Sequence, residues 1–444
     1  MDIRSFTSSN RLLYILVTSI AVLVLLTIVL ILRNLGGTAN ERITLEFWGV
    51  FDNQDAYSTV IKKFQGLHSN IRVNYKLISF ADYERQLIDS LAAGTGPDVV
   101  MIHHTWLPKH GDKLVAMPTD KLPGYDGPLM TLKEFQEQFV DVAYDDLVFD
   151  NQIYSMPIYV DTLGLFYNKD LFNSAGIVKP PESWEDFNDN VTRLTRFDES
   201  GNITQSGAAI GSARNINRST DILMGLMLQS GVQMTDAGRT MATFTRSVDN
   251  QIVGETALKY YTEFTDSDKR TYTWNDSQHY SVDAFTEGKA AMMFNYAHQV
   301  DIIRDKASRL NFAVAPMPQL TNDPLYQVTY ANYWTPAVTI NSRYPNQAWE
   351  FIAYLASKEG ALDYLSATRR PAARRDVIEL QKDDQDLGVF ATQALTARSW
   401  YQVDNVAIEG IFADMIEQVI FNEASPKDAL REAESAVNVL MGRR

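Results

Sequence analysis

The chain has 444 residues, which is too long for one small domain and suits two domains that each bury a core. Its net charge of −15 argues against nucleic acid as a partner, because phosphate binding needs a basic surface. Cysteine is absent, which excludes a disulfide framework, a thiolate metal site and a cysteine nucleophile.

The first distinctive segment is Leu12–Leu32, an uncharged run rich in leucine, valine and isoleucine that is long enough to cross a bilayer as a helix. A cleavable signal peptide is the alternative, because Gly37, Thr38 and Ala39 offer small residues at a possible cleavage point. The apolar run is longer than a typical signal core, so we favour an uncleaved transmembrane helix. Residues 1–42 are therefore expected to form a membrane anchor and a short tether.

The segment after the tether has the pattern of a parallel α/β unit. Residues 43–49 alternate apolar and polar side chains with the period of a β-strand, and residues 71–77 do so again. Apolar residues at helical spacing predict helices over residues 54–66 and from residue 82 onward. The apolar segment 98–102 predicts a short buried strand. The loops of such a β-α-β-α-β unit collect at one sheet edge, which is where ligands bind in these folds.

Two kinds of local signal mark later elements. Thr131 and Ser183 stand where a helix N-cap is expected, and Ser183 is followed by acidic residues that favour a helix start. Residues 198–202 are typical of a polar hairpin tip, and residues 214–231 predict a long helix. These signals predict several helices and turns between residues 131 and 231.

Four short motifs follow one another in order along the chain. Residues 92–100 are Ala-Ala-Gly-Thr-Gly-Pro-Asp-Val-Val, and residues 167–172 are Tyr-Asn-Lys-Asp-Leu-Phe. Residues 180–187 are Pro-Pro-Glu-Ser-Trp-Glu-Asp-Phe, and residues 284–292 are Ala-Phe-Thr-Glu-Gly-Lys-Ala-Ala-Met. Together with the Phe-Trp pair that ends the first strand, they resemble the extracytoplasmic solute-binding proteins of ABC importers. The closest resemblance is to the sugar-binding family that includes maltose-binding protein.

This resemblance covers residues 43–440 and implies an α/β fold of two lobes, joined by a hinge of three crossovers, with the solute in the cleft. One N-terminal transmembrane helix is expected to precede this periplasmic-binding-protein-like fold. The resemblance also implies that the binding domain lies outside the cytoplasm and that ABC permease subunits are its partners. The expected division is residues 1–42 for the anchor and tether, 43–158 and 312–342 for lobe 1, and 159–311 and 343–444 for lobe 2.

Sugar binding needs flat apolar faces for the C–H groups of pyranose rings and planar polar groups for their hydroxyls. Trp106, Trp334 and Trp400 lie in or near predicted loops, although each could instead pack under a loop. Other polar residues lie where the family that the chain resembles contacts its solute. The candidate ligand-binding residues are Asp52, Asn53, His104, Trp106, Asp161, Asn215, Asn295, Tyr296, Trp334, Arg369 and Trp400.

Metal binding and catalysis are the competing chemistries. His103 and His104 are adjacent at a strand end, where neighbouring side chains point to opposite faces and make a poor metal pair. Tyr260 and Tyr261 resemble the paired tyrosines of iron-binding relatives, but consecutive helical side chains diverge, which favours core packing. The sequence has no serine-hydrolase elbow, phosphate loop or zinc-protease motif. We therefore expect no metal, no cofactor and no catalytic residue.

The expected function is that of a membrane-tethered, extracytoplasmic solute-binding protein of an ABC importer. We expect it to bind a mono- or oligosaccharide as a monomer and to deliver the sugar to the permease. Three alternatives stay open: a surface glycan-processing enzyme, a non-transport sensor on the same fold, and a binding protein for a non-sugar solute. A catalytic carboxylate pair in the cleft favours the enzyme, and ligand-induced closure without turnover favours transport.

Overall fold

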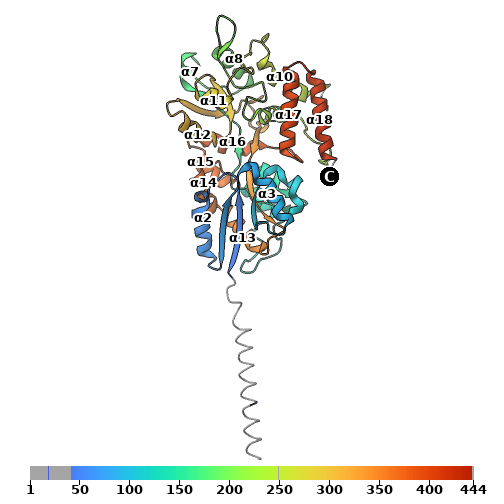
Figure 1. Cartoon of the computed structure of the whole chain (residues 1–444). Helices are drawn as coiled ribbons and strands as arrows, with labels where there is room; N and C mark the ends of the chain where they lie inside the picture. Colours follow the sequence, from blue (N-terminus) through green and yellow to red (C-terminus); the bar gives the residue numbers. More distant parts are fainter. Residues whose placement is uncertain (1–18, 20–41, 249, 443–444) are drawn as a thin grey trace, which may run out of the picture.

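The structure is a computed structural model that describes residues 19, 42–248 and 250–442. These residues form two lobes stacked along the long axis of the molecule, each with its own hydrophobic core (Figure 1). The predicted anchor Leu12–Leu32 lies outside the described residues apart from Ser19. In the part of the chain that is described, no helix is both long and apolar enough to cross a membrane.

Lobe 1 is built on a five-stranded sheet of order β2-β1-β3-β16-β4. β1 pairs in parallel with β2 and β3, and β16 runs antiparallel to β3, so the predicted β-α-β-α-β unit is confirmed. α2, α13 and α14 pack against one another beside this sheet. The main elements of lobe 1 are β1 (Ile43–Gly49), α2 (Gln54–Leu67), β2 (Ile71–Leu77), α3 (Phe80–Ala92), β3 (Val99–His103), α4 (Leu107–His110), β4 (Leu114–Val115), α5 (Leu132–Gln138), α6 (Asp141–Leu147), β5 (Val148–Phe149), β6 (Gln152–Ile153), β16 (Trp334–Thr339), α13 (Pro345–Leu355), α14 (Lys358–Thr368) and α15 (Arg375–Gln381).

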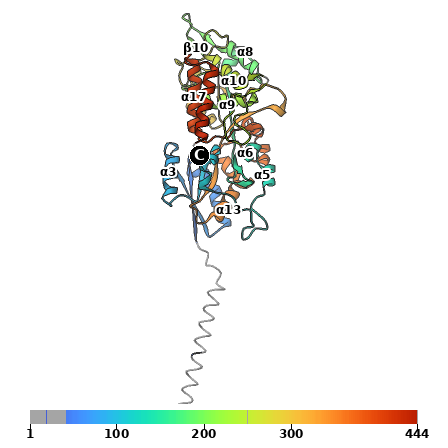
Figure 2. The same cartoon turned by 90° about the vertical axis from the view of Figure 1, so that its right-hand side faces the viewer.

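Lobe 2 is built on a three-stranded antiparallel sheet of order β13-β8-β14, surrounded by helices. Figure 2 shows α17 and α18 side by side on this lobe, while α13 and α3 belong to the other. The main elements of lobe 2 are β8 (Gly164–Asn168), α7 (Lys169–Ser174), α8 (Trp184–Leu194), β9 (Arg196–Phe197), β10 (Ile203–Gln205), α9 (Ser219–Gln229), β11 (Ser247–Val248), β12 (Gln251–Ile252), α10 (Val253–Thr262), α11 (Ser281–Thr286), β13 (Met292–Asn295), α12 (Gln299–Lys306), β14 (Phe312–Pro316), α17 (Asn405–Ile420) and α18 (Pro426–Met441).

The hinge between the lobes is a small sheet in which three passages of the chain meet. β7 (Asp161–Thr162), β15 (Thr329–Asn332) and β17 (Ala397–Arg398) lie in the order β17-β15-β7. The short helix α16 (Gly388–Gln393) ends beside them, and its last residue, Gln393, is buried. The Gln393 side-chain amide donates to the carbonyl of Leu163 at 3.0 Å and accepts from the N–H of Met317 at 2.8 Å.

The packing of the two cores differs from the sequence-based division of the chain in two places. Residues 343–444 were assigned to lobe 2, but side chains of α13, α14 and α15 are buried in the core of lobe 1. Residues 312–342 were assigned to lobe 1, but β14 pairs with β8 in the sheet of lobe 2. In both cases the tertiary partner of an amphipathic element decides its lobe, and local sequence does not specify that partner.

Most of the local signals are confirmed. Thr131 caps α5 and Ser183 caps α8, each with the reciprocal hydrogen bonds of a capping box. The helix predicted over residues 214–231 is shorter, because Arg218 has a left-handed backbone with φ of 63° and α9 begins after it. A left-handed residue cannot continue a right-handed helix, so the preceding residues form an irregular loop.

Replacing Gln393 with methionine should destabilise the protein, because the shape is kept while Leu163 and Met317 lose a buried hydrogen-bond partner. We expect a loss of about 2–6 kcal/mol in the free energy of unfolding, since each of the two buried groups left unpaired costs about 1–3 kcal/mol. The control is Gln418→Met, because the Gln418 side chain donates only a 3.5 Å hydrogen bond to Glu432 at the surface. Equal unfolding curves for both variants in denaturant would contradict the role of Gln393.

Candidate functional site

A cavity of about 620 Å³ lies between the two lobes, with walls from lobe 1, the hinge and lobe 2; we call it the cleft cavity. Its lobe 1 wall forms where strands of the large sheet end, as expected for the loops of a parallel α/β unit. The side chains that line it are Phe51, Phe80, His103, His104, Tyr159, Asp161, Asn217, Arg218, Asp221, Met224, Tyr296, His298, Ile302, Tyr330, Asn332, Trp334, Arg370, Gln402, Asn405, Val406 and Glu409.

The lobe 1 wall carries an aromatic platform made by the exposed rings of Phe51 and Phe80, with the buried ring of Trp334 beside them. The rings of Phe51 and Phe80 stack with centroids 5.5 Å apart and an interplanar angle of 21°, yet these residues are 50% and 57% exposed. Trp334 meets Phe51 edge-on at 5.6 Å and fixes the platform to the end of β16. Exposed stacked rings in a cavity offer a flat apolar surface to a ligand.

The hinge wall is polar and held by its own hydrogen bonds. Asp161 accepts from the N–H of Ala297 at 3.1 Å and from the N–H of Thr162 at 2.9 Å, which orients its carboxylate. Asn332 lies 3.3 Å from Nε2 of His103. Burial, and next the neighbouring His104, hold the pKa of His103 well below its usual range, so the imidazole is neutral.

The lobe 2 wall presents charged groups opposite the platform. Tyr296 donates to Oδ2 of Asp221 at 2.7 Å, and burial raises the pKa of Tyr296 well above its usual value, so it remains a donor. The Arg218 guanidinium lies 5.5 Å from the Tyr296 ring centroid and 3.9 Å from Asp221. Glu409 faces the cavity from α17, and burial, followed by the Asp221 charge, raises the pKa of its carboxyl.

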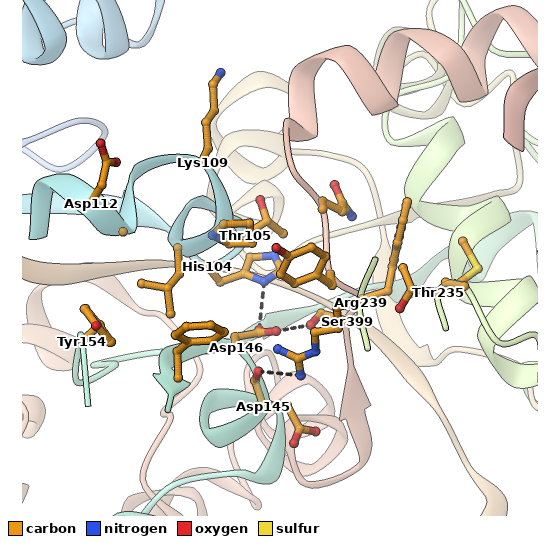
Figure 3. A pocket seen from close by; sticks show the side chains of 18 of the residues that line it. His104, Thr105, Lys109, Asp112, Asp145, Asp146, Tyr154, Thr235, Arg239 and Ser399 are labelled. Atoms are coloured by element: carbon orange, nitrogen blue, oxygen red, sulfur yellow. Dashed lines mark hydrogen bonds and ion pairs between the residues drawn. The ribbon is translucent and has the colours of Figure 1, made fainter. Parts of the chain in front are cut away.

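A second and larger space, of about 1030 Å³, lies between the lobes beyond the segment 399–402; we call it the side cavity (Figure 3). Asp146 is its central polar group: it accepts from Tyr333 at 2.8 Å and from Ser399, and it lies 2.9 Å from Nδ1 of His104. At the edge of the cavity, Arg239 of lobe 2 donates to the carbonyl of Asp145 in lobe 1 at 3.3 Å.

Two contacts join the lobes near the start of α17. Trp106 Nε1 donates to Asn405 Oδ1 at 3.0 Å, and Lys109 Nζ lies 2.8 Å from Asp404 and 2.6 Å from Glu84. Asn405 lines the cleft cavity and Lys109 lines the side cavity. The first turn of α17 is thereby tied to lobe 1 at the boundary of the two cavities.

Comparison with known proteins identifies what kind of molecule has this cleft. A family model described as bacterial extracellular solute-binding protein matches residues 59–390, which is more than half of the chain. The chain belongs to this family. The resemblance drawn from the sequence motifs is thus confirmed, and so is the expectation of a binding protein rather than an enzyme.

Individual relatives are distant but cover most of this solute-binding protein. The maltodextrin-binding protein MdxE of Bacillus subtilis is 25% identical over 378 residues, which span 80% of this chain and 81% of the relative. The cyclic α-maltosyl-1,6-maltose binding protein of Arthrobacter globiformis has a similar structure, with a TM-score of 0.73, 20% identity, and coverage of 90% and 100%. The sugar-binding protein MalE of Xanthomonas citri also has a TM-score of 0.73, with 18% identity and coverage of 90% and 98%. These structures confirm the two-lobed α/β fold of residues 42–248 and 250–442.

The structure brings four of the predicted site residues together in the cleft cavity: His104, Asp161, Tyr296 and Trp334. Trp400 lines the side cavity instead, where His104 also contributes. Contact of these residues with solute stays a prediction.

Six further predicted residues lie outside the lining of both cavities. Trp106 is only 4% exposed and packs between Tyr83 and Trp334, with its indole N–H on Asn405. Each of the other five has a structural partner in place of an open position. Asp52 pairs with Arg370, Asn53 caps α2, Asn215 bonds to Trp274, Asn295 bonds to Asn217, and Arg369 pairs with Asp386.

Sequence reasoning missed several cleft residues, of which Phe51, Phe80 and Arg218 are the most prominent. Phe51 belongs to the loop that was expected at the ligand-binding edge, so the signal was present but only tryptophans were considered as stacking groups. Phe80 begins α3, where it could be mistaken for a packing residue. Arg218 enters the site because its left-handed backbone ends a loop there, and no pattern in the sequence indicates that turn.

The adjacent histidines differ from the sequence-based picture. Their rings lie side by side with centroids 4.3 Å apart, because β3 ends at His103 and a tight turn begins at His104. Each ring is engaged separately: Nδ1 of His103 lies 2.7 Å from the Thr105 hydroxyl, and His104 contacts Asp146. Among the described residues, no three His, Asp or Glu side chains form a group that could hold a metal ion.

His103 should make the stability of the protein fall as the pH falls. Its pKa is lowered in the folded state, so the unfolded chain binds a proton first, below a pH of about 6.5. The His103→Gln variant should lose a part of this dependence, up to about 1.4 kcal/mol per pH unit between pH 6.5 and 5. Urea unfolding at pH 7 and pH 5 measures the difference, and parallel pH dependences in both proteins would contradict it.

Proposed function

We propose that this protein binds a carbohydrate in the cleft cavity and delivers it to the permease subunits of an ABC importer. The observation that carries the proposal is the exposed, stacked pair of Phe51 and Phe80 opposite a polar wall. A pyranose ring has the same two characters, since its C–H groups form an apolar face and its hydroxyls project around the rim.

The polar wall has the groups that sugar hydroxyls require. Arg218 supplies donors in a planar fork, Asp221 and Glu409 supply acceptors, and Tyr296 supplies a neutral hydroxyl. Each hydroxyl can both donate and accept, so a wall that mixes donors and acceptors suits a polyol better than an apolar solute. The names of the relatives that bind maltodextrin or maltose-derived sugars support the same class of solute.

The two walls belong to different lobes, so a bound sugar would contact both. Binding then favours the conformation in which the lobes are closest, because only that conformation completes the site. From the predicted residues, we assign His104, Asp161, Tyr296 and Trp334 to this site, joined by the platform and by Arg218. A closed, loaded form is what a permease would recognise.

We further propose that residues 1–42 tether the protein to the outer face of the membrane. The uncharged run Leu12–Leu32 supports this, together with the extracellular character of the family. Membrane fractionation with N-terminal sequencing tests it. A mature, soluble chain that began at Asn40 would contradict the tether and leave sugar binding untouched.

Removing one ring of the platform should weaken sugar binding and leave the fold intact. After a thermal-shift screen of mono- and oligosaccharides finds a ligand, we expect Phe80→Ala to raise the dissociation constant by roughly 5- to 150-fold. This corresponds to about 1–3 kcal/mol per stacked ring. Isothermal titration calorimetry measures the affinity, and the melting temperature reports on the fold.

Phe197→Ala is the matched control. Phe197 is as exposed as Phe51, and it stacks on Tyr272 at 5.9 Å and 13°, but it lies on the β9 strand of lobe 2 and outside the cavity. This variant should bind as the unchanged protein does. Equal affinity in Phe80→Ala and Phe197→Ala would remove the platform from the binding site.

A further inference from the structure

The cleft cavity has more carboxylates than guanidiniums in its lining, and its three histidines, His103, His104 and His298, carry a charge only when protonated. Asp161, Asp221 and Glu409 contribute carboxylates, and Arg218 and Arg370 contribute guanidiniums. Arg370 is already paired with Asp52 at 2.7 Å, behind the cavity wall. Among the described residues of the lining, Arg218 is therefore the only arginine or lysine whose charge is left for the three carboxylates.

Asp221 and Glu409 are the least compensated of these carboxylates. Asp221 is only 7% exposed; it accepts the Tyr296 hydroxyl, but its nearest cation, Arg218, lies at 3.9 Å, beyond hydrogen-bond reach. For Glu409, no donor within the described chain forms a hydrogen bond with the carboxylate. Both carboxylates line the cleft cavity; burial, and next the charge of Asp221, raise the pKa of the Glu409 carboxyl, while the charge of Arg218 acts in the opposite direction.

A helix end supplies part of the missing positive charge. α9 begins directly after Arg218, so its positive end faces the cavity with about half an elementary charge. α17 begins at Asn405, but the Asp404 side chain caps this helix and offsets its positive end. α3 also begins at the cavity, but Asp82 in its first turn offsets that end. With Arg218 and one helix end set against three carboxylates, a deficit of more than one positive charge remains.

Resting on the proposed function, we propose that the solute is a carbohydrate that carries a basic nitrogen, with its ammonium group facing Asp221 and Glu409. Closure of the lobes removes water from these carboxylates, and a carboxylate without a partner is costly in such a place. A neutral hydroxyl offers one donor, whereas an ammonium offers three donors and the missing charge. The same wall repels an acidic sugar.

Matched sugars test the charge directly. The probes are the glucosamine, galactosamine and mannosamine monomers and the β1-4 glucosamine dimer, each compared with its neutral and N-acetylated counterpart, and with galacturonate as the acidic sugar. For the amino sugar that binds most tightly, we expect a dissociation constant at least about tenfold lower than that of its neutral counterpart at pH 6, which is the effect of one close charge pair. Acetylation of the nitrogen should abolish this gain, and galacturonate should bind most weakly.

Glu409→Gln locates the effect in the cleft, because it removes the charge and keeps the shape. It should reduce the ratio of amine to neutral affinity by about tenfold. The control Glu423→Gln removes the same charge beyond the other end of α17, where Glu423 is exposed, and should keep the ratio. An unchanged ratio in Glu409→Gln, or an equal change in both variants, overturns the proposal.

The outcomes for the two proposals are distinct. If neutral sugars bind as tightly as the corresponding amino sugars, the proposal that the solute carries a basic nitrogen is wrong, and the proposal of carbohydrate binding stands. If the acidic sugar binds best, the charge assignment of the cleft is wrong. If no amine and no neutral sugar in the panel binds, while an amino acid or polyamine does, the carbohydrate proposal fails together with this inference.

Discussion

The two lobes depend on one buried glutamine at the hinge. The side chain of Gln393 bonds to the carbonyl of Leu163 and to the N–H of Met317, and the backbone carbonyl of Gln393 accepts from the Thr329 hydroxyl at 3.1 Å. Leu163 lies on the passage through β7, Met317 and Thr329 lie on the passage through β15, and Gln393 itself precedes β17. Because a buried amide left unpaired is costly, the three passages are held as one unit. The cleft can therefore change its width without the hinge sheet coming apart.

Movement at this hinge affects both cavities at once. The cleft cavity and the side cavity share His104 and Gln402, and the segment 399–402 with the first turn of α17 separates them. The contacts of Trp106 with Asn405 and of Lys109 with Asp404 lie at this boundary and join lobe 1 to the start of α17.

Short-range features could be predicted from the sequence, and features that need a tertiary partner could not. The strands and helices of residues 43–103 and the caps at Thr131 and Ser183 follow from periodicity and local hydrogen bonding, which act within a few residues. The assignment of α13 to lobe 1 depends on its contact with α2, nearly 300 residues earlier in the chain. The site shows the same limit: the loop of Asp52 was expected at the cleft, but the pairing of Asp52 with Arg370 leaves Phe51 as the exposed side chain.

The separation of the two kinds of recognition group between the lobes determines how the site can work. Lobe 1 offers the apolar platform of Phe51 and Phe80, and lobe 2 offers the charges of Arg218, Asp221 and Glu409. Neither wall alone satisfies a solute with both an apolar face and polar groups, so each lobe by itself is a weak half-site. Affinity then depends on how much better the closed form binds the solute than the open form does. A ligand with equal affinity for both forms would not shift the equilibrium between them. In the proposed site the polar wall would also set the selectivity of this step, because a solute that leaves Asp221 or Glu409 unpaired would make closure unfavourable even where it stacks well.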